Sequence, residues 1–238
     1  PGKRYTVTVA SGLVDRFGQK LGADAKLDFT TDDLWPTLEL GVTGNVLEPS
    51  RSRAIPVATL NVESFELAMR RLGEDELLAL EARDASPGRL TKLDELPTGS
   101  TRTTIRPGAA KNKLGSTDVD PAKILGGKDA RGAFAVAAQF TERPGTPRAR
   151  PSVRSAIVQV TDLGITAKLG TDGAFVWVTK LSTGAPVSGA TVTVRRPGKA
   201  ALGPFTTDAR GVATVTGFAH AKSPERETAI VFVRAGDD

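Results

Sequence analysis

The sequence predicts an all-β protein made of tandem β-sandwich domains, and three observations support this fold class. Short segments that alternate apolar and polar residues recur along the whole chain. Turn-forming Gly, Pro, Asn and Asp residues separate these segments at short intervals. Helical periodicity is confined to one stretch, so a parallel sheet with crossover helices is not expected. We therefore expect stacked sandwiches with one short helix.

The composition excludes several classes of function. The 238 residues include no Cys and a single His, His220. Disulfides, thiolate metal sites and cysteine nucleophiles are therefore absent, and a Ser-His-Asp triad would depend on one residue. No apolar run approaches the roughly 20 residues that span a bilayer, and no signal peptide is visible in a chain that opens at Pro1. We expect no cofactor, no metal ion and no membrane insertion of this chain.

The net charge of +5 is concentrated between Thr101 and Arg154, where 11 Lys and Arg residues accompany 4 Asp and Glu residues. A basic stretch is one feature of nucleic-acid binding. Aromatic residues make up only 5% of the chain, however, and this stretch lacks the interleaved stacking residues of single-strand binders. We therefore expect solvated loops here and no nucleic-acid partner.

The first domain, residues 1–33, is predicted to be incomplete. Tyr5–Val9 and Leu27–Thr31 alternate and are rich in strand formers, and the turn-rich segment 12–18 lies between them. An isolated hairpin is only marginally stable in water. We expect these strands to be the C-terminal part of a sandwich whose earlier strands precede Pro1.

The second domain is predicted to cover residues 34–150, and Trp35-Pro36 marks its start because proline restricts the residue before it. We expect its strands at Thr37–Val42, Ala54–Val62, Phe65–Leu72, Thr101–Arg106 and Gly132–Phe140. Pro56 places the second of these at a sheet edge, or itself near the start of the strand. The last strand is apolar from Gly132 to Ala138, which predicts burial on both faces.

One helix is predicted at Glu74–Arg83, which combines strong helix formers with an acidic first turn and ends before Pro87. We expect it to cover one end of the sheet. Outside the predicted strand, the segment 88–128 favours long loops. The segment 142–151 is expected to be an exposed loop or linker, rich in Pro and Arg.

The third domain, residues 151–238, has the cleanest β pattern. Its expected strands are Ala156–Val160, Gly164–Leu169, Ala174–Thr179, Ala190–Arg195, Val212–Val215 and Ala229–Val233. Short strands with turn signals at this spacing predict a β-sandwich.

Several stretches together resemble one family. Tyr5–Val9, Asp15–Leu21 and Phe29–Thr31 are similar to the end of a bacterial immunoglobulin-like domain. Ile55–Val62, leading into Phe65–Leu72, is similar to the strand pair that opens the next domain of bacterial alpha-2-macroglobulins. The most specific combination is Val158–Ile165 with Val176–Val192 and Thr207–Gly211, which resembles a macroglobulin-like domain of that family.

The resemblance implies immunoglobulin-like and macroglobulin-like sandwiches in a periplasmic, membrane-anchored, broad-spectrum protease inhibitor. Such proteins are similar to traps in which a protease cuts a bait segment, and in many members a Cys-Gln thioester then links the protease. A chain without Cys cannot hold that thioester. The resemblance therefore implies a non-catalytic scaffold, with neighbouring domains and the target proteases of the full-length protein as partners.

Two other classes of function stay open. An envelope adhesin would display ligand loops, for which the segment 88–128 is the candidate. A carbohydrate-binding module would present an exposed aromatic platform, which the low aromatic content disfavours.

The residues that stand out have structural explanations, so no catalytic, cofactor-binding or metal-binding residue is predicted. Gly184 and Gly189 suit turns, Pro186 and Val187 the start of a strand, and Asp208 and Gly211 a hairpin turn. A recognition loop at Gly184 and a calcium loop at Asp208 are the functional alternatives.

The remaining polar and aromatic candidates are also assigned to the scaffold. His220 is expected in an exposed loop, and Gly126-Gly127-Lys128 lacks the rest of a phosphate-binding motif. Trp35 is expected to pack at a domain junction and Trp177 within the last sandwich. Three pairs of acidic residues are expected to be solvated or to cap backbone amides. The pairs are Asp32-Asp33, Asp118 with Asp120, and Asp237-Asp238. Glu74-Asp75-Glu76 is explained by the helix N-terminus.

Overall fold

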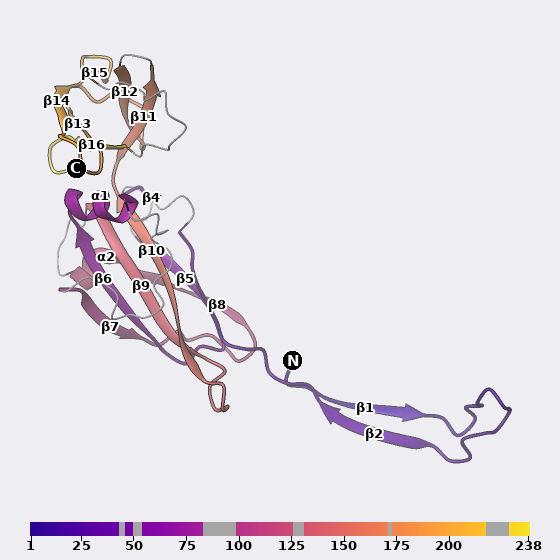
Figure 1. Ribbon diagram of the computed structural model, residues 1–238. Coiled ribbons are helices and arrows are strands. Elements are labelled where there is room, and N and C mark those ends of the chain that lie inside the picture. The colour runs from indigo at the N-terminus through magenta and orange to yellow at the C-terminus, as the bar shows by residue number, and fades with distance from the viewer. Residues whose placement is uncertain (43–45, 50–53, 83–98, 126–130, 171–172, 218–228) are drawn as a thin grey trace.

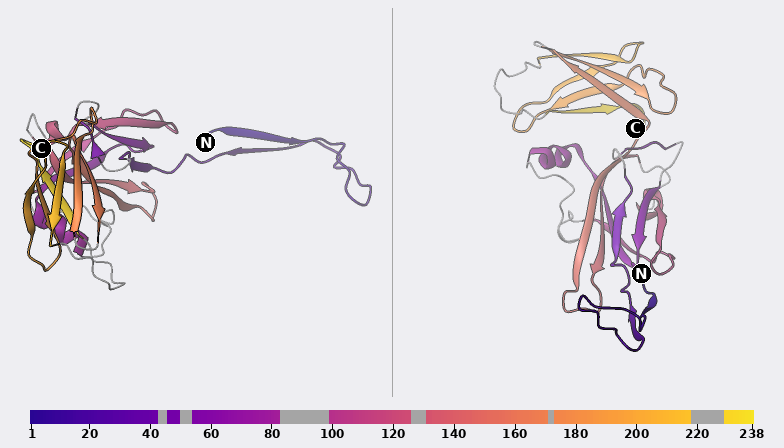
Figure 2. Two further views of the ribbon diagram at one scale, coloured as in Figure 1. Left: turned by 90° about the horizontal axis from the view of Figure 1, so that it is seen from above. Right: turned by 90° about the vertical axis from the view of Figure 1, so that its right-hand side faces the viewer.

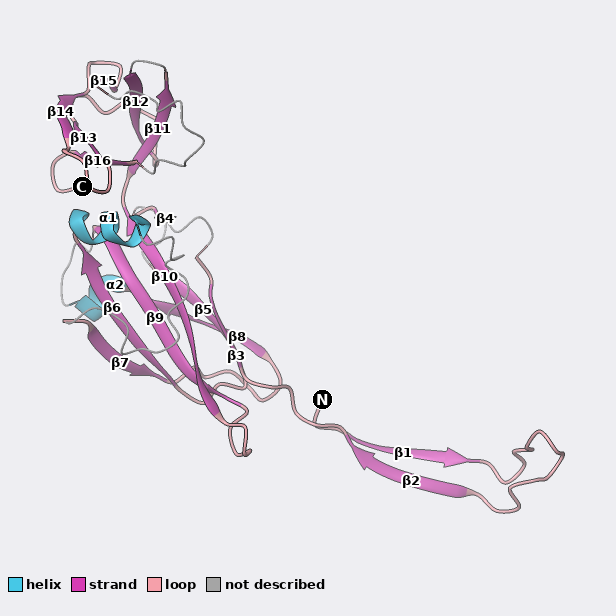
Figure 3. Ribbon diagram, viewed as in Figure 1, coloured by secondary structure: helices cyan, strands magenta, loops and turns pink. Residues whose placement is uncertain are grey.

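The protein is described from a computed structural model, which places residues 1–42, 46–49, 54–82, 99–125, 131–170, 173–217 and 229–238. The chain forms three modules in sequence order, which we name the N-terminal hairpin, the central sandwich and the C-terminal sandwich (Figure 1, Figure 3). The sheets confirm the expected all-β fold class.

The N-terminal hairpin consists of β1 (Arg4–Val9) and β2 (Ala25–Thr30), which pair antiparallel. Tyr5 lies opposite Phe29, and the two rings stack with their centroids 5.5 Å apart. Both strands are almost entirely exposed. The hairpin projects away from the two sandwiches (Figure 2, left).

The central sandwich packs a five-stranded sheet on a three-stranded sheet. The larger sheet has the order β4 (Val46–Leu47), β10 (Arg150–Val160), β9 (Gly132–Glu142), β6 (Phe65–Leu72), β7 (Thr101–Ile105). The smaller sheet has the order β3 (Thr37–Leu40), β5 (Ile55–Leu60), β8 (Leu114–Val119). Helix α1 (Glu74–Ala82) follows β6, and the short α2 (Pro121–Leu125) follows β8.

Strand β9 is buried on both faces, as its continuous apolar sequence predicts. Phe134 and Val136 belong to the main core between the two sheets. Ala135 and Ala137 point to the other face, where they cluster with Leu72. Two buried faces require apolar residues at successive positions, since side chains alternate along a strand.

The C-terminal sandwich packs two three-stranded sheets face to face. One has the order β11 (Leu163–Leu169), β12 (Gly173–Lys180), β15 (Val212–Thr216). The other has the order β14 (Leu202–Thr206), β13 (Thr191–Arg195), β16 (Ile230–Arg234). Its core consists of small and β-branched residues, among them Val176, Val178, Val192 and Val215.

One domain boundary and one strand position differ from the expectation. The segment 142–151 is not a linker, because β9 and β10 pair along their whole length on either side of it. The central sandwich therefore extends to Val160, and the expected boundary at residue 150 lies inside a hairpin. Pro56 does lie near the start of β5, but β5 is the central strand of its sheet, so the edge assignment is wrong.

Several elements were not expected. Strand β8 and helix α2 occupy part of the segment that favoured loops, and β14 lies where no strand was expected. The described chain therefore has two helices where the sequence predicted one. Helix α1 confirms the predicted helix and lies across the end of the larger sheet that faces the C-terminal sandwich (Figure 1). The predicted helix stop at Pro87 lies outside the described residues.

Candidate functional site

Polar side chains gather at the two junctions between modules. Among the described residues, no group of three or more His, Cys, Asp or Glu side chains could hold a metal ion. Within the same ranges, no helix is both long enough and apolar enough to cross a membrane. The junctions are therefore the candidate functional features.

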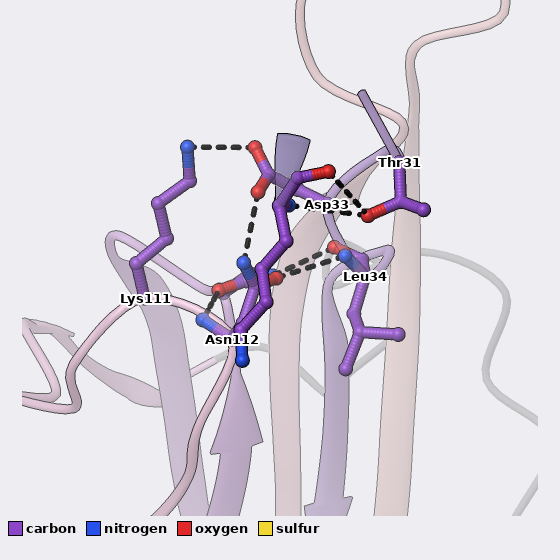
Figure 4. A network of polar contacts seen from close by, with 7 residues as sticks. Thr31, Asp33, Leu34, Lys111 and Asn112 are labelled. Carbon is purple, nitrogen blue, oxygen red and sulfur yellow. Dashed lines mark hydrogen bonds and ion pairs between the residues drawn. The ribbon is translucent and has the colours of Figure 1, made fainter. Parts of the chain in front are cut away.

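Asp33 ties the N-terminal hairpin to the central sandwich (Figure 4). Its carboxylate accepts a hydrogen bond from the Asn112 side-chain amide at 2.8 Å and forms an ion pair with Lys111 at 2.6 Å. These two donors hold the pKa of Asp33 below its ordinary value, because they favour the charged form. Asp33 is exposed, as expected, and its carboxylate also takes part in this side-chain network.

Two asparagines complete this junction. Asn112 Oδ1 accepts from the backbone amide of Leu34 at 2.9 Å and from Asn61 Nδ2 at 2.9 Å. Asn61 Oδ1 in turn accepts from the backbone amide of Asn112 at 2.6 Å. Both asparagines have positive φ, which Asn tolerates better than most residues. The linker is thereby bonded to two loops of the central sandwich.

Trp35 lies at this junction, but its packing is looser than expected. Trp35 is 54% exposed, and the Arg143 guanidinium lies 5.7 Å from the centroid of its ring. The ring therefore stacks with a cation on the surface and does not enter a core.

The second junction passes through two residues, Thr161 and Asp162. The Thr161 amide donates to the Leu47 carbonyl of the central sandwich at 3.1 Å. The Asp162 carboxylate accepts from the backbone amide and the hydroxyl of Ser182, at 2.8 and 3.0 Å, in the C-terminal sandwich. Thr161 is thus fixed to one module and the next residue to the other.

Asp238 bridges the modules beside this linker. Its carboxylate accepts from the Asp162 amide at 2.8 Å and from Arg131 Nη1 at 3.0 Å, and its side chain is only 6% exposed. The expected capping role of this acidic residue is confirmed, and Arg131 adds an ion pair to the central sandwich.

Helix α1 makes the third contact across this junction. Glu74, its first residue, interacts with Arg234 at 2.5 Å and with Arg195 at 3.7 Å. Asp75 interacts with Arg195 at 2.6 Å. Both arginines belong to the C-terminal sandwich. The acidic first turn therefore does more than stabilise its own helix.

The Gly and Asp residues of the third domain have the expected turn roles. Gly184 and Gly189 have φ of 74° and 75°. Asp208 Oδ1 accepts from the backbone amides of Arg210 and Val212, each at 2.9 Å, and these bonds lower the pKa of Asp208. Gly211 has φ of 76°. Pro186 makes only an isolated bridge and begins no regular strand.

Thr207 is a structural residue that the sequence did not reveal. Its side chain is buried, and its hydroxyl accepts from the Ala190 amide at 2.8 Å and donates to the Val187 carbonyl at 2.7 Å. It thereby joins the two halves of the sequence pattern that resembles macroglobulin-like domains. Its position directly before the Asp208 turn was the available signal.

Trp177 does not pack inside the last sandwich, which corrects that expectation. It is 47% exposed on the outer face of β12, and its indole Nε1 donates to the Arg210 carbonyl at 3.1 Å. Phe175, two residues earlier on the same face, is also exposed. The inner face of this strand carries Ala174, Val176 and Val178, which are small enough for the closely packed core.

The remaining polar candidates cap helices or lie outside the described residues. Asp120 caps α2 by accepting from the Ala122 amide, and Glu76 caps α1 by accepting from the Gly73 amide. His220 and the segment 126–128 lie outside the described residues. The candidate adhesin loop is partly replaced by β7, β8 and α2, which are regular elements of the central sandwich.

Comparison with known families decides the relationship. The sequence model of the bacterial alpha-2-macroglobulin MG3 domain matches residues 160–238, which are the C-terminal sandwich with the preceding linker. The C-terminal sandwich is thus similar to the MG3 domain of bacterial alpha-2-macroglobulins. This match, together with the relatives below, confirms the resemblance seen in the sequence.

Relatives agree with this assignment over more of the chain. An alpha-2-macroglobulin homolog of Nostoc sp. is 23% identical over 198 residues, covering 82% of this chain and 10% of the relative. An alpha-2-macroglobulin of Xylella fastidiosa is 30% identical over 100 residues, covering 42% of this chain and 6% of the relative. The chain thus spans a tenth or less of the length of these curated relatives.

Solved structures share the fold. Native Escherichia coli alpha-2-macroglobulin spanning domains MG0-NIE-MG1 matches 98% of this chain and 75% of that chain, with a TM-score of 0.55 and 17% identity. The version spanning NIE-MG1 matches 86% of this chain and 95% of that chain, with a TM-score of 0.59 and 17% identity. Macroglobulin-type β-sandwiches therefore account for the architecture.

Proposed function

We propose that this chain is a non-catalytic scaffold segment of a bacterial alpha-2-macroglobulin that traps proteases in the periplasm. Similarity to bacterial alpha-2-macroglobulins supports the trap, and the expected membrane anchoring of the full-length protein rests on the same resemblance. The observation most consistent with scaffolding is that polar contacts tie each module to the next while each sandwich keeps its own core. Such a stack spaces distant parts of a large protein and transmits motion between them.

The N-terminal hairpin fits this proposal as the last two strands of an immunoglobulin-like domain. Its apolar residues Tyr5, Val7, Leu27 and Phe29 pair on one face and are exposed. The E. coli structure without the MG0 domain matches 86% of the 238 residues and leaves about 33 unmatched, whereas the one with MG0 matches 98%. An unmatched length close to that of the hairpin segment supports its assignment to an MG0-like domain.

Protease assays test the scaffold function. The isolated chain is expected neither to hydrolyse casein nor to protect it from serine proteases and metalloproteases. The full-length protein is expected to protect it, and inserting a flexible glycine–serine segment between Thr161 and Asp162 is expected to weaken that protection. Hydrolysis or inhibition by the isolated chain would contradict the proposal, as would full protection by the insertion variant.

One observation favours a second candidate, which is glycan binding. Phe175 and Trp177 form the exposed aromatic platform that this function requires, and the indole hydrogen bond holds one ring in place. Titration of the chain with cell-wall glycan fragments, followed by the indole N–H resonance of Trp177, tests it. Resonances that stay unchanged at millimolar glycan, with a Trp177→Ala variant as the control, would eliminate this candidate.

A further inference from the structure

Two carboxylates of helix α1 contact the C-terminal sandwich, and of these Glu74 lies near both arginines, whereas Asp75 contacts Arg195. Glu74 Oε1 lies 2.5 Å from Arg234 Nη2, and Glu74 Oε2 lies 3.7 Å from Arg195 Nη1. The side chains of Glu74 and Arg195 are 27% and 25% exposed, so solvent screens this pair less than a fully exposed one. The carboxylate also lies at the helix N-terminus, where the macrodipole favours negative charge.

The two arginines reach Glu74 from opposite ends of one strand pair. Strands β13 and β16 run antiparallel, with Arg234 opposite Thr191 and Arg195 opposite Ile230. The arginine positions are therefore four residues apart along the strands, or about 13 Å. A carboxylate held from both ends has a fixed position along the strands, which a single ion pair would not provide.

The covalent connection between the sandwiches lies to one side of this contact. Thr161 is bonded to the central sandwich and Asp162 to the C-terminal sandwich, so the chain passes from one module to the other at the bond between them. Helix α1 follows β6, which is separated from β10 by β9. The helix is thus two strand spacings from the linker, roughly 10 Å. Figure 2 (right) shows α1 below the C-terminal sandwich and away from this connection.

The two sandwiches have separate hydrophobic cores. The two main core clusters share no residue within the described parts of the chain. Ion pairs that are partly exposed contribute little stability and weaken with salt. The junction therefore combines a firmly bonded linker with a charged contact that can be released without unfolding either module.

From this geometry we propose that Glu74, Arg195 and Arg234 form an ionic latch that sets the angle between the central and C-terminal sandwiches. When the latch is broken, the C-terminal sandwich rotates about the bond between Thr161 and Asp162, and both sandwiches stay folded. The latch is a mechanical property of this chain and does not depend on its proposed role in a protease trap. In that role, the latch would control how far the two sandwiches move relative to each other when the full-length protein rearranges.

Spin-label distances test the latch directly. The chain has no Cys, so Thr104→Cys on β7 and Thr214→Cys on β15 give two labels at exposed positions, one in each sandwich. The parent chain is expected to give one narrow distance distribution. Glu74→Arg is expected to shift the mean distance and broaden the distribution, with an unchanged far-UV circular dichroism spectrum. Combining it with Arg195→Glu and Arg234→Glu is expected to restore the narrow distribution.

Variants that neutralise a charge without reversing it provide a second test of the latch. Glu74→Gln removes the charge with almost no change in shape and is expected to broaden the distribution. Asp75→Asn, at a carboxylate that is 87% exposed and is paired with Arg195, is expected to broaden the distribution less than Glu74→Gln does. A parent-like distribution in a folded Glu74→Gln chain, or a broad distribution in the parent itself, would overturn the latch. Neither result depends on protease inhibition, so a failed latch and a failed scaffold function can be told apart.

Discussion

Two buried threonines are expected to respond in opposite ways, in the stability of their sandwiches, to replacement by Val. Thr207, in the C-terminal sandwich, uses its hydroxyl for two hydrogen bonds. Thr59, in the central sandwich, is 1% exposed, and its hydroxyl has no partner within the described chain. Replacement by Val keeps the shape and removes the hydroxyl. We therefore expect Thr207→Val to destabilise its sandwich and Thr59→Val to stabilise its own.

The magnitudes follow from the groups that are left without partners. Thr207→Val orphans the buried Ala190 N–H and removes one donor from the Val187 carbonyl. An unsatisfied buried polar group costs about 1–3 kcal/mol, so the expected loss in the free energy of unfolding is about 2–4 kcal/mol. Thr59→Val removes such a group and is expected to add about 1–3 kcal/mol. Each kcal/mol shifts the melting temperature of a domain of this size by roughly 4–8 °C.

Urea unfolding of single-tryptophan chains separates the two sandwiches. Trp177 fluorescence, in a Trp35→Phe background, follows the C-terminal sandwich, and amide hydrogen exchange follows the central one. Thr→Ser at each site is the matched control, since it keeps the hydroxyl and removes a methyl group worth about 0.8 kcal/mol. A Thr207→Val chain that is no less stable than Thr207→Ser would refute these roles of the hydroxyls, as would a change of stability in the same direction for both Val variants.

Three further changes test other parts of the chain. Gly211→Ala is expected to lower the free energy of unfolding by more than the roughly 1–2 kcal/mol of left-handed backbone strain, because the new Cβ would lie 2.5 Å from a backbone oxygen of β12. Gly198→Ala is the control, since its Cβ would have open space, and thermal melts compare the two variants. Ala137→Leu is expected to overpack the second face of β9 and cost about 1–3 kcal/mol, measured by urea unfolding. Asp33 has a lowered pKa, so its stabilisation of the first junction is complete above the ordinary carboxyl pKa of about 3.9 and is lost as the pH falls through the lowered value. A carboxyl resonance that titrates at the ordinary pKa would contradict this, and Lys111→Met is expected to raise the pKa toward that value.

Local patterns were sufficient for most strands and for α1. Alternation located β1, β12 and β13 to within a residue or two, because a half-buried strand has to alternate. Strand β14 was missed, since Gly203 and Pro204 interrupt its short sequence. Helix α2 was missed because five residues are too few to show a period.

The junction contacts could not be predicted in the same way. Glu74 and Arg234 are 160 residues apart, and Lys111 and Asp33 are 78 apart, so no local spacing links them. The sequence neighbours of Glu74 indicated that it stabilises its own helix, and those of Asp33 indicated a solvated or capping carboxylate. The fold brings Arg234 to Glu74 and Lys111 to Asp33, and these distant partners change the interpretation of both carboxylates.

The sequence by itself determined the β class, the two-sided burial of β9 and the turns at Gly184, Gly189 and Gly211, because each depends on the residue and its immediate neighbours. It also contained the family resemblance. The tertiary structure decided that β10 completes the central sandwich, that Trp177 points outward and that Glu74 meets two arginines. These features depend on which distant strands pair and which faces meet, and that choice is made by packing of the whole chain.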